Sequence, residues 1–307
     1  MQTYHFTIAE DDEEIRIDRW LIGCIDSLSR SYIQKLIKDE QLSVNGKCVK
    51  ASYVVHIGDS IDITVPDAMK PDIEPENIAL SVLYEDNDVL VVDKPKGMVV
   101  HPAAGHASGT LVNALLYYCK DSLSGINGIM RPGIVHRIDK DTTGSLIICK
   151  NDAAHTNIAQ QLKEHTITRK YIAIVYGVIK DDEGVIDAPI GRSSADRKKM
   201  AVLTHGGKDA VTHFRVLKRY KDFTYVECVL ETGRTHQIRV HMSHIGHPLL
   251  GDEVYAPGRK CKFAHLEGQT LHAMVLGFRH PVTGEYIETV APVPAYFQHL
   301  LDILPIA

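Results

Sequence analysis

The chain has 307 residues, which is long enough for one large domain and a smaller one. Its 44% hydrophobic and 24% charged residues are typical of a globular protein, and the lack of an apolar run of about 18 residues excludes a membrane-spanning helix. The net charge of −5 argues mildly against a general nucleic-acid binder, although a local basic patch can still bind phosphate. The first residues soon turn acidic and do not form a secretory signal, so we expect a cytoplasmic protein.

The six cysteines are scattered along the chain, and none forms a Cys-x-x-Cys pair. Several of them lie inside apolar runs. We therefore expect buried, reduced thiols rather than disulfides or a zinc site.

Residues 15–66 form a segment with the pattern of two helices followed by strands. Residues at helical spacing give the first helix an apolar stripe, namely Ile17, Trp20, Leu21 and Ile25. The second helix has the same spacing at Ile33, Leu36 and Ile37, and Ser29 or Ser31 could cap it. The pair Asn45-Gly46 predicts a hairpin, and alternation over 61–65 predicts a strand. This pattern predicts a small α-α-β domain over residues 1–66.

Residues 66–78 contain three prolines among charged side chains, which is typical of a semi-rigid linker. We therefore place the linker at 67–78 and a large domain at 79–307. The large domain is rich in short strands, which we expect at 81–84, 89–92, 171–176, 211–217 and 224–230, with one helix over 110–120. Few helices and hairpin-like connections favour an α+β fold with a mixed, mainly antiparallel sheet and a central cleft.

The most informative stretch is 136–144 (HRIDKDTTG), which lies between the apolar runs 132–135 and 145–149. Buried charge without a partner is unfavourable, so a charged segment in this position belongs at a sheet edge or in a cleft. Such a place suits a catalytic carboxylate.

This stretch resembles the signature His-Arg-Leu-Asp-x-x-Thr-Ser-Gly of the RluA-type pseudouridine synthases, with Ile138 in place of Leu and Thr143 in place of Ser. The resemblance implies that Asp139 is the catalytic aspartate and that Arg137 braces or fills the position of a flipped-out uridine. Residues 93–102 (DKPKGMVVHP) resemble the first motif of the same family, whose turn would shape a wall of the cleft.

Two further segments follow in the order that the family has. In 169–171 (RKY), the resemblance makes Tyr171 the tyrosine that stacks on the target base, whereas by itself it would be taken for a core residue of a strand. In 232–241 (TGRTHQIRVH), it makes Arg239 the partner of the Asp139 carboxylate. The histidines at 236, 241, 244 and 247 suggest zinc, but they lack His-Glu-x-x-His spacing and lie among arginines, so we expect no metal.

The small domain resembles the RNA-binding domain named after ribosomal protein S4, through 29–37 (SRSYIQKLI) and 44–47 (VNGK). The resemblance implies that basic side chains grip RNA, although they could also be ordinary surface charges; the candidates are Arg30, Lys35, Lys38 and Lys47. A second basic group resembles a family segment, but Ser193-Ser194 departs from its usual His-Pro; the candidates there are Arg192, Arg197 and Lys198.

Together these resemblances imply an enzyme that isomerises specific uridines in RNA to pseudouridine by base flipping, without a cofactor. The motif residues resemble most those of the RluD-like enzymes. We therefore expect large-subunit ribosomal RNA, or the ribosomal particle, as the partner, and transfer RNA is the alternative. We expect no membrane partner, and a monomer suffices.

Two other functions compete with this one. A non-catalytic ribosome-assembly factor would explain the small domain but not Asp139, Tyr171 and Arg239 together. A nucleoside or glycoside hydrolase would need a second carboxylate as its acid; Asp141 is the candidate, but we expect it to point away from Asp139.

Overall fold

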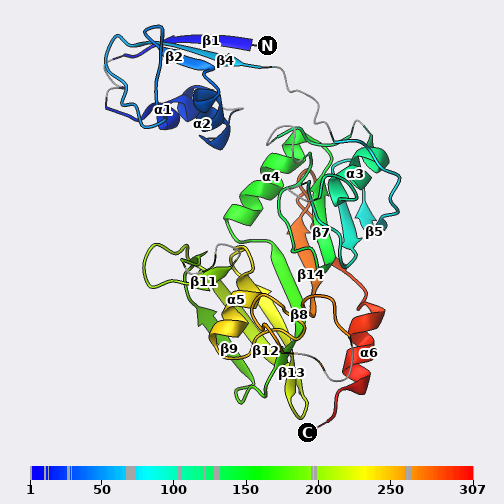
Figure 1. Cartoon of the computed structure of the whole chain (residues 1–307). Coiled ribbons are helices and arrows are strands. Elements are labelled where there is room, and N and C mark those ends of the chain that lie inside the picture. Colours follow the sequence, from blue (N-terminus) through cyan, green and yellow to red (C-terminus); the bar gives the residue numbers. More distant parts are fainter. Residues whose placement is uncertain are drawn as a thin grey trace. The chain divides into compact units, whose positions relative to one another are not determined.

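The computed structural model describes the chain except residues 1, 10–11, 13, 26–27, 29, 67–72, 103–105, 121, 127–131, 195, 197–198, 260, 262–264 and 307. The chain divides into a small unit, Met1–Asp72 with Gly125–Pro132, and a large unit, Ile73–Ser124 with Gly133–Ala307 (Figure 1). Half of the expected linker lies outside the described residues, so its bounds and stiffness stay predictions.

The small unit is built from two helices and an antiparallel sheet. The helices are α1 (Ile17–Cys24) and α2 (Arg30–Lys38), and the sheet has the order β1-β4-β2-β3, with β1 at Gln2–Thr7, β2 at Leu42–Val44, β3 at Lys47–Cys48 and β4 at Ser60–Val65. The expected apolar stripes of both helices are buried in one core with Ile61 and Ile63. Asn45 and Gly46 both have positive φ, which is the backbone of the tight hairpin that this pair predicts. Ser31 lies inside α2 and Ser29 lies outside the described residues, so which of them caps the helix stays a prediction.

A mixed sheet forms the large unit, and it has nine strands in the described part of the chain. Its order is β5 (Ser81–Glu85), β6 (Val89–Lys94), β7 (Thr143–Cys149), β14 (Leu271–Arg279), β8 (Thr168–Tyr176), β13 (Phe223–Leu230), β12 (Val211–Arg219) and β9 (Glu183–Asp187), and β15 (Tyr286–Val290) also pairs with β14. Only the β7–β14 pairing is parallel among these described strands. A separate hairpin joins β10 (Ile190–Arg192) to β11 (Met200–Val202). The expected mainly antiparallel α+β fold is thus confirmed.

Helices cover both faces of this sheet (Figure 1). They are α3 (Leu111–Cys119), α4 (Asp152–Lys163), α5 (Gln237–His244) and α6 (Ala295–Ile303). Successive side chains of a strand point to opposite faces, so β6 and β7 send alternate residues to the core under α3 and to the core under α4. In the same way β8 sends Tyr171, Ala173 and Val175 to the α5 face, and Ile172 and Ile174 to the α6 face. This alternation decides which side chains of β8 can reach the site.

Gly144 lets β7 begin beside β14. Its φ is 109°, and a Cβ at this position would lie 2.3 Å from the carbonyl oxygen of Ala273. Only glycine fits such a close approach in the left-handed region. The glycine that ends the 136–144 stretch is therefore needed for the parallel pairing, five residues after Asp139.

We expect Gly144→Ala to destabilise the large unit by about 2–3 kcal/mol, because both the clash and the backbone conformation oppose a side chain. Calorimetric unfolding of the whole chain measures this. The matched control is Gly23→Ala in α1, where nothing lies within 4 Å of the added Cβ and alanine favours the helix. Equal unfolding temperatures for the Gly144 variant and the wild type would contradict the assignment.

The expectation for the cysteines is only partly correct. Cys119, Cys149 and Cys228 are buried free thiols, but Cys24 and Cys48 are exposed. Cys24 ends α1 and Cys48 lies in the edge strand β3, where the chain leaves the core.

None of the described helices has the length and hydropathy to cross a bilayer.

Candidate active site

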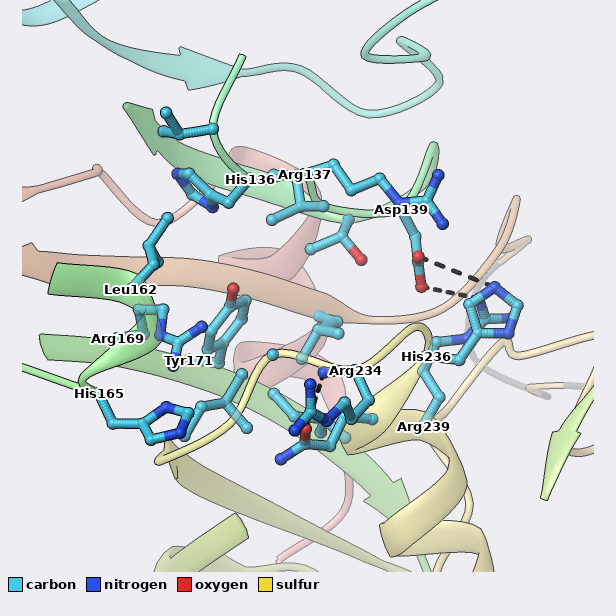
Figure 2. A pocket seen from close by; sticks show the side chains of 18 of the residues that line it. His136, Arg137, Asp139, Leu162, His165, Arg169, Tyr171, Arg234, His236 and Arg239 are labelled. Atoms are coloured by element: carbon cyan, nitrogen blue, oxygen red, sulfur yellow. Dashed lines mark hydrogen bonds and ion pairs between the residues drawn. The ribbon is translucent and has the colours of Figure 1, made fainter. Parts of the chain in front are cut away.

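A pocket of about 450 Å³ opens in the large unit between the segment before β7, the start of β8 and the start of α5 (Figure 2). Arg137, Asp139, Tyr171 and Arg239 all line it. These four residues come from three segments up to a hundred residues apart in the sequence. The fold therefore brings together the side chains that the motifs single out in the large domain.

Asp139 lies in a turn. The Thr142 N–H donates to the Asp139 carbonyl at 3.1 Å, so the segment is not extended. Asp141 is not among the residues that line the pocket, and its carboxylate packs on Gly268 instead. The turn, rather than strand alternation, separates the two carboxylates.

The first motif supports this turn through a buried lysine that sequence reasoning did not single out. The Lys94 ammonium donates to the carbonyl oxygens of Pro95 at 2.8 Å, Met98 at 2.9 Å and Lys140 at 2.9 Å. The side chain is fully buried, and burial lowers the pKa of Lys94 to about 7 against the opposing charges of nearby carboxylates. Lys94 thus ties the Pro95-Gly97 turn to the residue that follows Asp139.

Arg239 connects two carboxylates. Its Nη1 donates to Asp139 Oδ2 at 2.9 Å, while Nε and Nη2 donate to the two oxygens of Asp252 at 2.7 and 2.9 Å. Burial disfavours the charged guanidinium, but the hydrogen bonds and charges of Asp252 and Asp139 outweigh burial and raise the pKa of Arg239. Asp252 is fully buried and also accepts from the backbone N–H groups of Val254 and Tyr255. A bidentate contact of this kind fixes the plane of the guanidinium, and with it the Asp139 carboxylate.

His236 also faces Asp139. It precedes α5 with left-handed φ and ψ of 58° and 22°, a strained conformation for a residue other than glycine. Its Nδ1 lies 2.8 Å from the Tyr255 hydroxyl and its Nε2 lies 3.8 Å from Asp139 Oδ1. Burial lowers the pKa of His236, which favours the neutral imidazole. The neutral ring therefore lies beside the carboxylate, held by its contact with Tyr255.

The four histidines of this region do not converge on one point. His241 contacts the Thr212 hydroxyl and the Ala188 carbonyl, and His247 contacts the Tyr176 carbonyl. Among the described residues, the group with metal-ligand spacing is Asp86, Asp88 and His280 instead. There the His280 Nδ1 accepts from the N–H groups of Val282 and Thr283, so Nε2 carries the proton and donates to Asp86 at 2.8 Å. A protonated Nε2 has no lone pair for an ion.

Tyr171 forms a wall of the pocket. Its side chain is largely buried, and burial raises the pKa of Tyr171, so the phenol is neutral. His136 lines the same pocket, but its Nε2 accepts from the Ile147 N–H at 3.1 Å, and burial lowers the pKa of His136 to about 3. His136 therefore has a structural role in holding the segment onto β7.

Arg137 is the exposed arginine of the pocket rim. Its Nη2 lies 3.4 Å from the Thr235 hydroxyl, and Figure 2 shows its side chain extending past Asp139. An exposed guanidinium at this place can reach a nucleotide that enters the pocket.

The RNA-binding candidates differ in their surroundings. Lys35, Lys38 and Lys47 are exposed on the small unit, and Arg192 is exposed on the large one. Arg197 and Lys198 lie outside the described residues. The fold does not test whether any of these side chains contacts RNA, so their role in RNA binding stays a prediction.

Arg30 has a partner inside the small unit. Its Nε and Nη2 donate to Asp18 Oδ2 at 3.0 and 2.9 Å, and Arg16 and Gln34 donate to the same buried carboxylate. Burial alone would raise the pKa of Asp18, but the hydrogen bonds from Arg16, Gln34 and Arg30 lower it to about 2. Arg30 thus has a stabilising role whether or not it also touches RNA.

We expect Asp18→Asn to destabilise the small unit at neutral pH and to reduce its loss of stability in acid. The folded pKa is depressed, so the wild-type contribution is present above the usual value of 3.8 and disappears as pH falls through about 2. Trp20 in α1 is the chain's one tryptophan, so its fluorescence follows unfolding of this unit within the intact chain. Asp39→Asn, at an exposed position, is the control. Identical acid-unfolding curves for the Asp18 variant and the wild type would contradict this role.

Both parts of the chain resemble known protein families. The family model described as RNA pseudouridylate synthase matches residues 88–244, and the model described as S4 domain matches residues 27–61. The chain is 54% identical over 304 residues to a Bacillus subtilis protein named uncharacterized RNA pseudouridine synthase YlyB, covering 99% of each chain. It is 46% identical to the ribosomal large subunit pseudouridine synthase D of Zymomonas mobilis, covering 100% of this chain and 99% of the relative.

Solved structures give the same answer. Human RNA pseudouridylate synthase domain containing 4 superposes with a TM-score of 0.57 at 25% identity, covering 72% of this chain and 92% of its own. Human RNA pseudouridylate synthase domain containing 1 superposes with a TM-score of 0.56 at 26% identity, covering 78% of this chain and 100% of its own. By its sequence motifs, its fold and these full-length relatives, the chain belongs to the RNA pseudouridylate synthase family.

Proposed function

We propose that this pseudouridine synthase acts on large-subunit ribosomal RNA, with Asp139 as its catalytic carboxylate. The observation that carries the site assignment is the ion pair of 2.9 Å between Asp139 and Arg239 in the pocket. The substrate assignment is supported by relatives named ribosomal large subunit pseudouridine synthase D, which match this chain over almost all of its length at 46% identity in Zymomonas mobilis and 44% in Pseudomonas aeruginosa.

The reaction moves uracil from an N1–C1′ bond to a C5–C1′ bond and needs no net redox change. A stacked uridine cannot reach the pocket, so it must flip out of its helix, at a cost of a few kcal/mol. Asp139 then either attacks C1′ or removes a ribose proton. In both cases Arg239, itself held by Asp252, orients the carboxylate. Tyr171 supplies an aromatic wall for the base, and Arg137 at the rim braces the RNA strand that has lost it.

The small unit supplies RNA affinity in this proposal. Its exposed Lys35, Lys38 and Lys47 would contact phosphates, which gives affinity without sequence choice. Arg192, Arg197 and Lys198 would add contacts from the large unit. One chain carries all the proposed catalytic residues, so a monomer suffices, and a ribosomal RNA substrate implies a cytoplasmic enzyme.

The test is a map of pseudouridines in total RNA from cells with and without the gene, read by carbodiimide treatment and primer extension. We expect specific signals in large-subunit ribosomal RNA to vanish on deletion and to return with the wild-type gene. Signals that vanish only from transfer RNA would overturn the substrate assignment. If the Asp139→Asn gene restores the modification in full in the deletion cells, the site assignment is wrong.

A further inference from the structure

Arg169 is a buried arginine that the site described above does not use. It lies on β8 two residues before Tyr171, so strand alternation puts both side chains on the same face of the sheet. Figure 2 shows both of them at the pocket, which they line. Only 6% of Arg169 is exposed to solvent.

The guanidinium of Arg169 is poorly satisfied within the protein. Its Nη2 donates to the Glu231 carbonyl at 2.8 Å, while its Nε is buried and has no hydrogen-bond partner in the described chain. No described carboxylate forms an ion pair with it. Burial lowers the pKa of Arg169, and the nearby charge of Arg234 acts in the same direction. An arginine nevertheless stays protonated in proteins, so Arg169 is a buried cation with no ion-pair partner among the described residues.

The surroundings hold this cation in place. A Cβ on Gly233 would lie 2.6 Å from Arg169 Nη1, so the glycine leaves the room that the guanidinium occupies. The hydrogen bond to the Glu231 carbonyl fixes the second terminal nitrogen, Nη2. Buried unpaired donors are unfavourable, and a ligand in the pocket that accepts from Arg169 would remove this cost.

We propose that Arg169 is a further catalytic residue, which binds the carbonyl oxygens of the flipped uracil and stabilises the uracil anion when the glycosidic bond breaks. This inference rests on the proposed function of the pocket. Uracil is the group expected against Tyr171, and Arg169 is on the same strand face. The partner is therefore the base rather than a phosphate of the strand.

Breaking the glycosidic bond leaves negative charge on the base, which such a partner would stabilise. When N1–C1′ breaks, the electron pair stays on N1, and the negative charge spreads over N1, O2 and O4 of the base. This is so whether Asp139 has bonded to C1′ or has taken a ribose proton. C5 then bonds to C1′ as the bond between Asp139 and C1′ breaks or, on the other route, as the proton that Asp139 took returns to the ribose. The C5 proton leaves and a proton is taken up at N1, so no atom or electron is gained overall. A fixed cation beside the developing charge lowers the barrier, and removing one such donor typically slows a reaction by about 100-fold or more.

The test compares two RNA substrates in single-turnover reactions, one with uridine and one with 5-fluorouridine at the target position. Fluorine withdraws electrons and stabilises the departing anion by itself. Both reactions are followed by formation of the C5–C1′ bond, because fluorouridine has no C5 proton to lose afterwards. We expect Arg169→Met to slow this bond formation by about 100-fold with uridine and much less with fluorouridine. The ratio of the two rates should therefore rise at least about tenfold, with a smaller rise for Arg169→Lys, which keeps the charge. Because the ratio does not depend on how much enzyme is folded, partial misfolding does not affect it.

Arg279→Met is the matched control. This arginine ends β14, is exposed and donates to the Gly284 carbonyl, so its variant should keep the wild-type ratio. An unchanged ratio in both Arg169 variants would overturn the inference, since a purely structural role slows both substrates equally. Asp139→Asn is run alongside: if it is inactive while the Arg169 ratio is unchanged, only this inference fails, whereas full activity of Asp139→Asn overturns the proposed function itself.

Discussion

Asp139→Asn is expected to reduce pseudouridine formation by roughly 10⁴-fold or more, because it removes the one carboxylate among the described residues that line the pocket. The carboxamide has nearly the shape of the carboxylate and can still accept from Arg239 Nη1, so the turn and the pocket should persist. RNA affinity should stay within about twofold of wild type, since the positioning contacts to phosphate lie elsewhere. The measurement is a single-turnover assay with a filter-binding titration on the same RNA.

Asp187→Asn, at an exposed position of β9, is the control for the loss of a carboxylate. It should keep the wild-type rate. If the Asp139 variant keeps more than about a tenth of the wild-type rate, a catalytic role is contradicted. Removing a group that takes part in bond making should lower the rate much further.

Arg239→Lys is expected to cost about 10³-fold in the single-turnover rate although it keeps the positive charge. Lysine has one nitrogen where arginine has three, so it cannot bond to Asp139 and to both oxygens of Asp252 at once. The rate of the chemical step should fall while RNA affinity stays unchanged, because the Arg239 side chain is almost fully buried and paired with carboxylates.

Asp252→Asn provides the companion measurement. It leaves the contact between Arg239 and Asp139 but weakens the anchor behind it, and we expect a loss of about 10- to 100-fold. Combining the two changes should cost little more than Arg239→Lys alone, because both act through one network. Additive losses would show that Asp252 does not act through Arg239.

The residues with a local signature were predictable from the sequence. Helical spacing predicts α1 and α2, and Asn45-Gly46 predicts the hairpin, because these patterns lie within a few neighbouring residues. Periodicity does not identify β14, since a mainly apolar strand that is buried on both faces looks the same in sequence as a buried helix. The family resemblance provided Asp139, Tyr171 and Arg239 because they lie inside ordered motifs.

Other parts of the site have no local signature. Asp252 lies in a loop after α5, and only tertiary contact shows that it holds Arg239. Arg169 belongs to a matching motif, but only the folded chain shows that its buried Nε has no hydrogen-bond partner among the described residues. The role of Lys94 depends on a carbonyl 46 positions away. A contact between distant segments depends on the packing of the whole sheet, so no window of sequence contains it.

The parallel pairing of β7 with β14 determines when the large unit can complete its fold during synthesis. It matches Thr143 and Gly144 with His272 and Ala273, so the sheet stays open until nearly the whole chain has left the ribosome. The small unit has its helices and strands within residues 2–65 and can fold as soon as that part emerges. A nascent chain thus acquires its S4-type RNA-binding module well before it acquires any means of breaking a glycosidic bond.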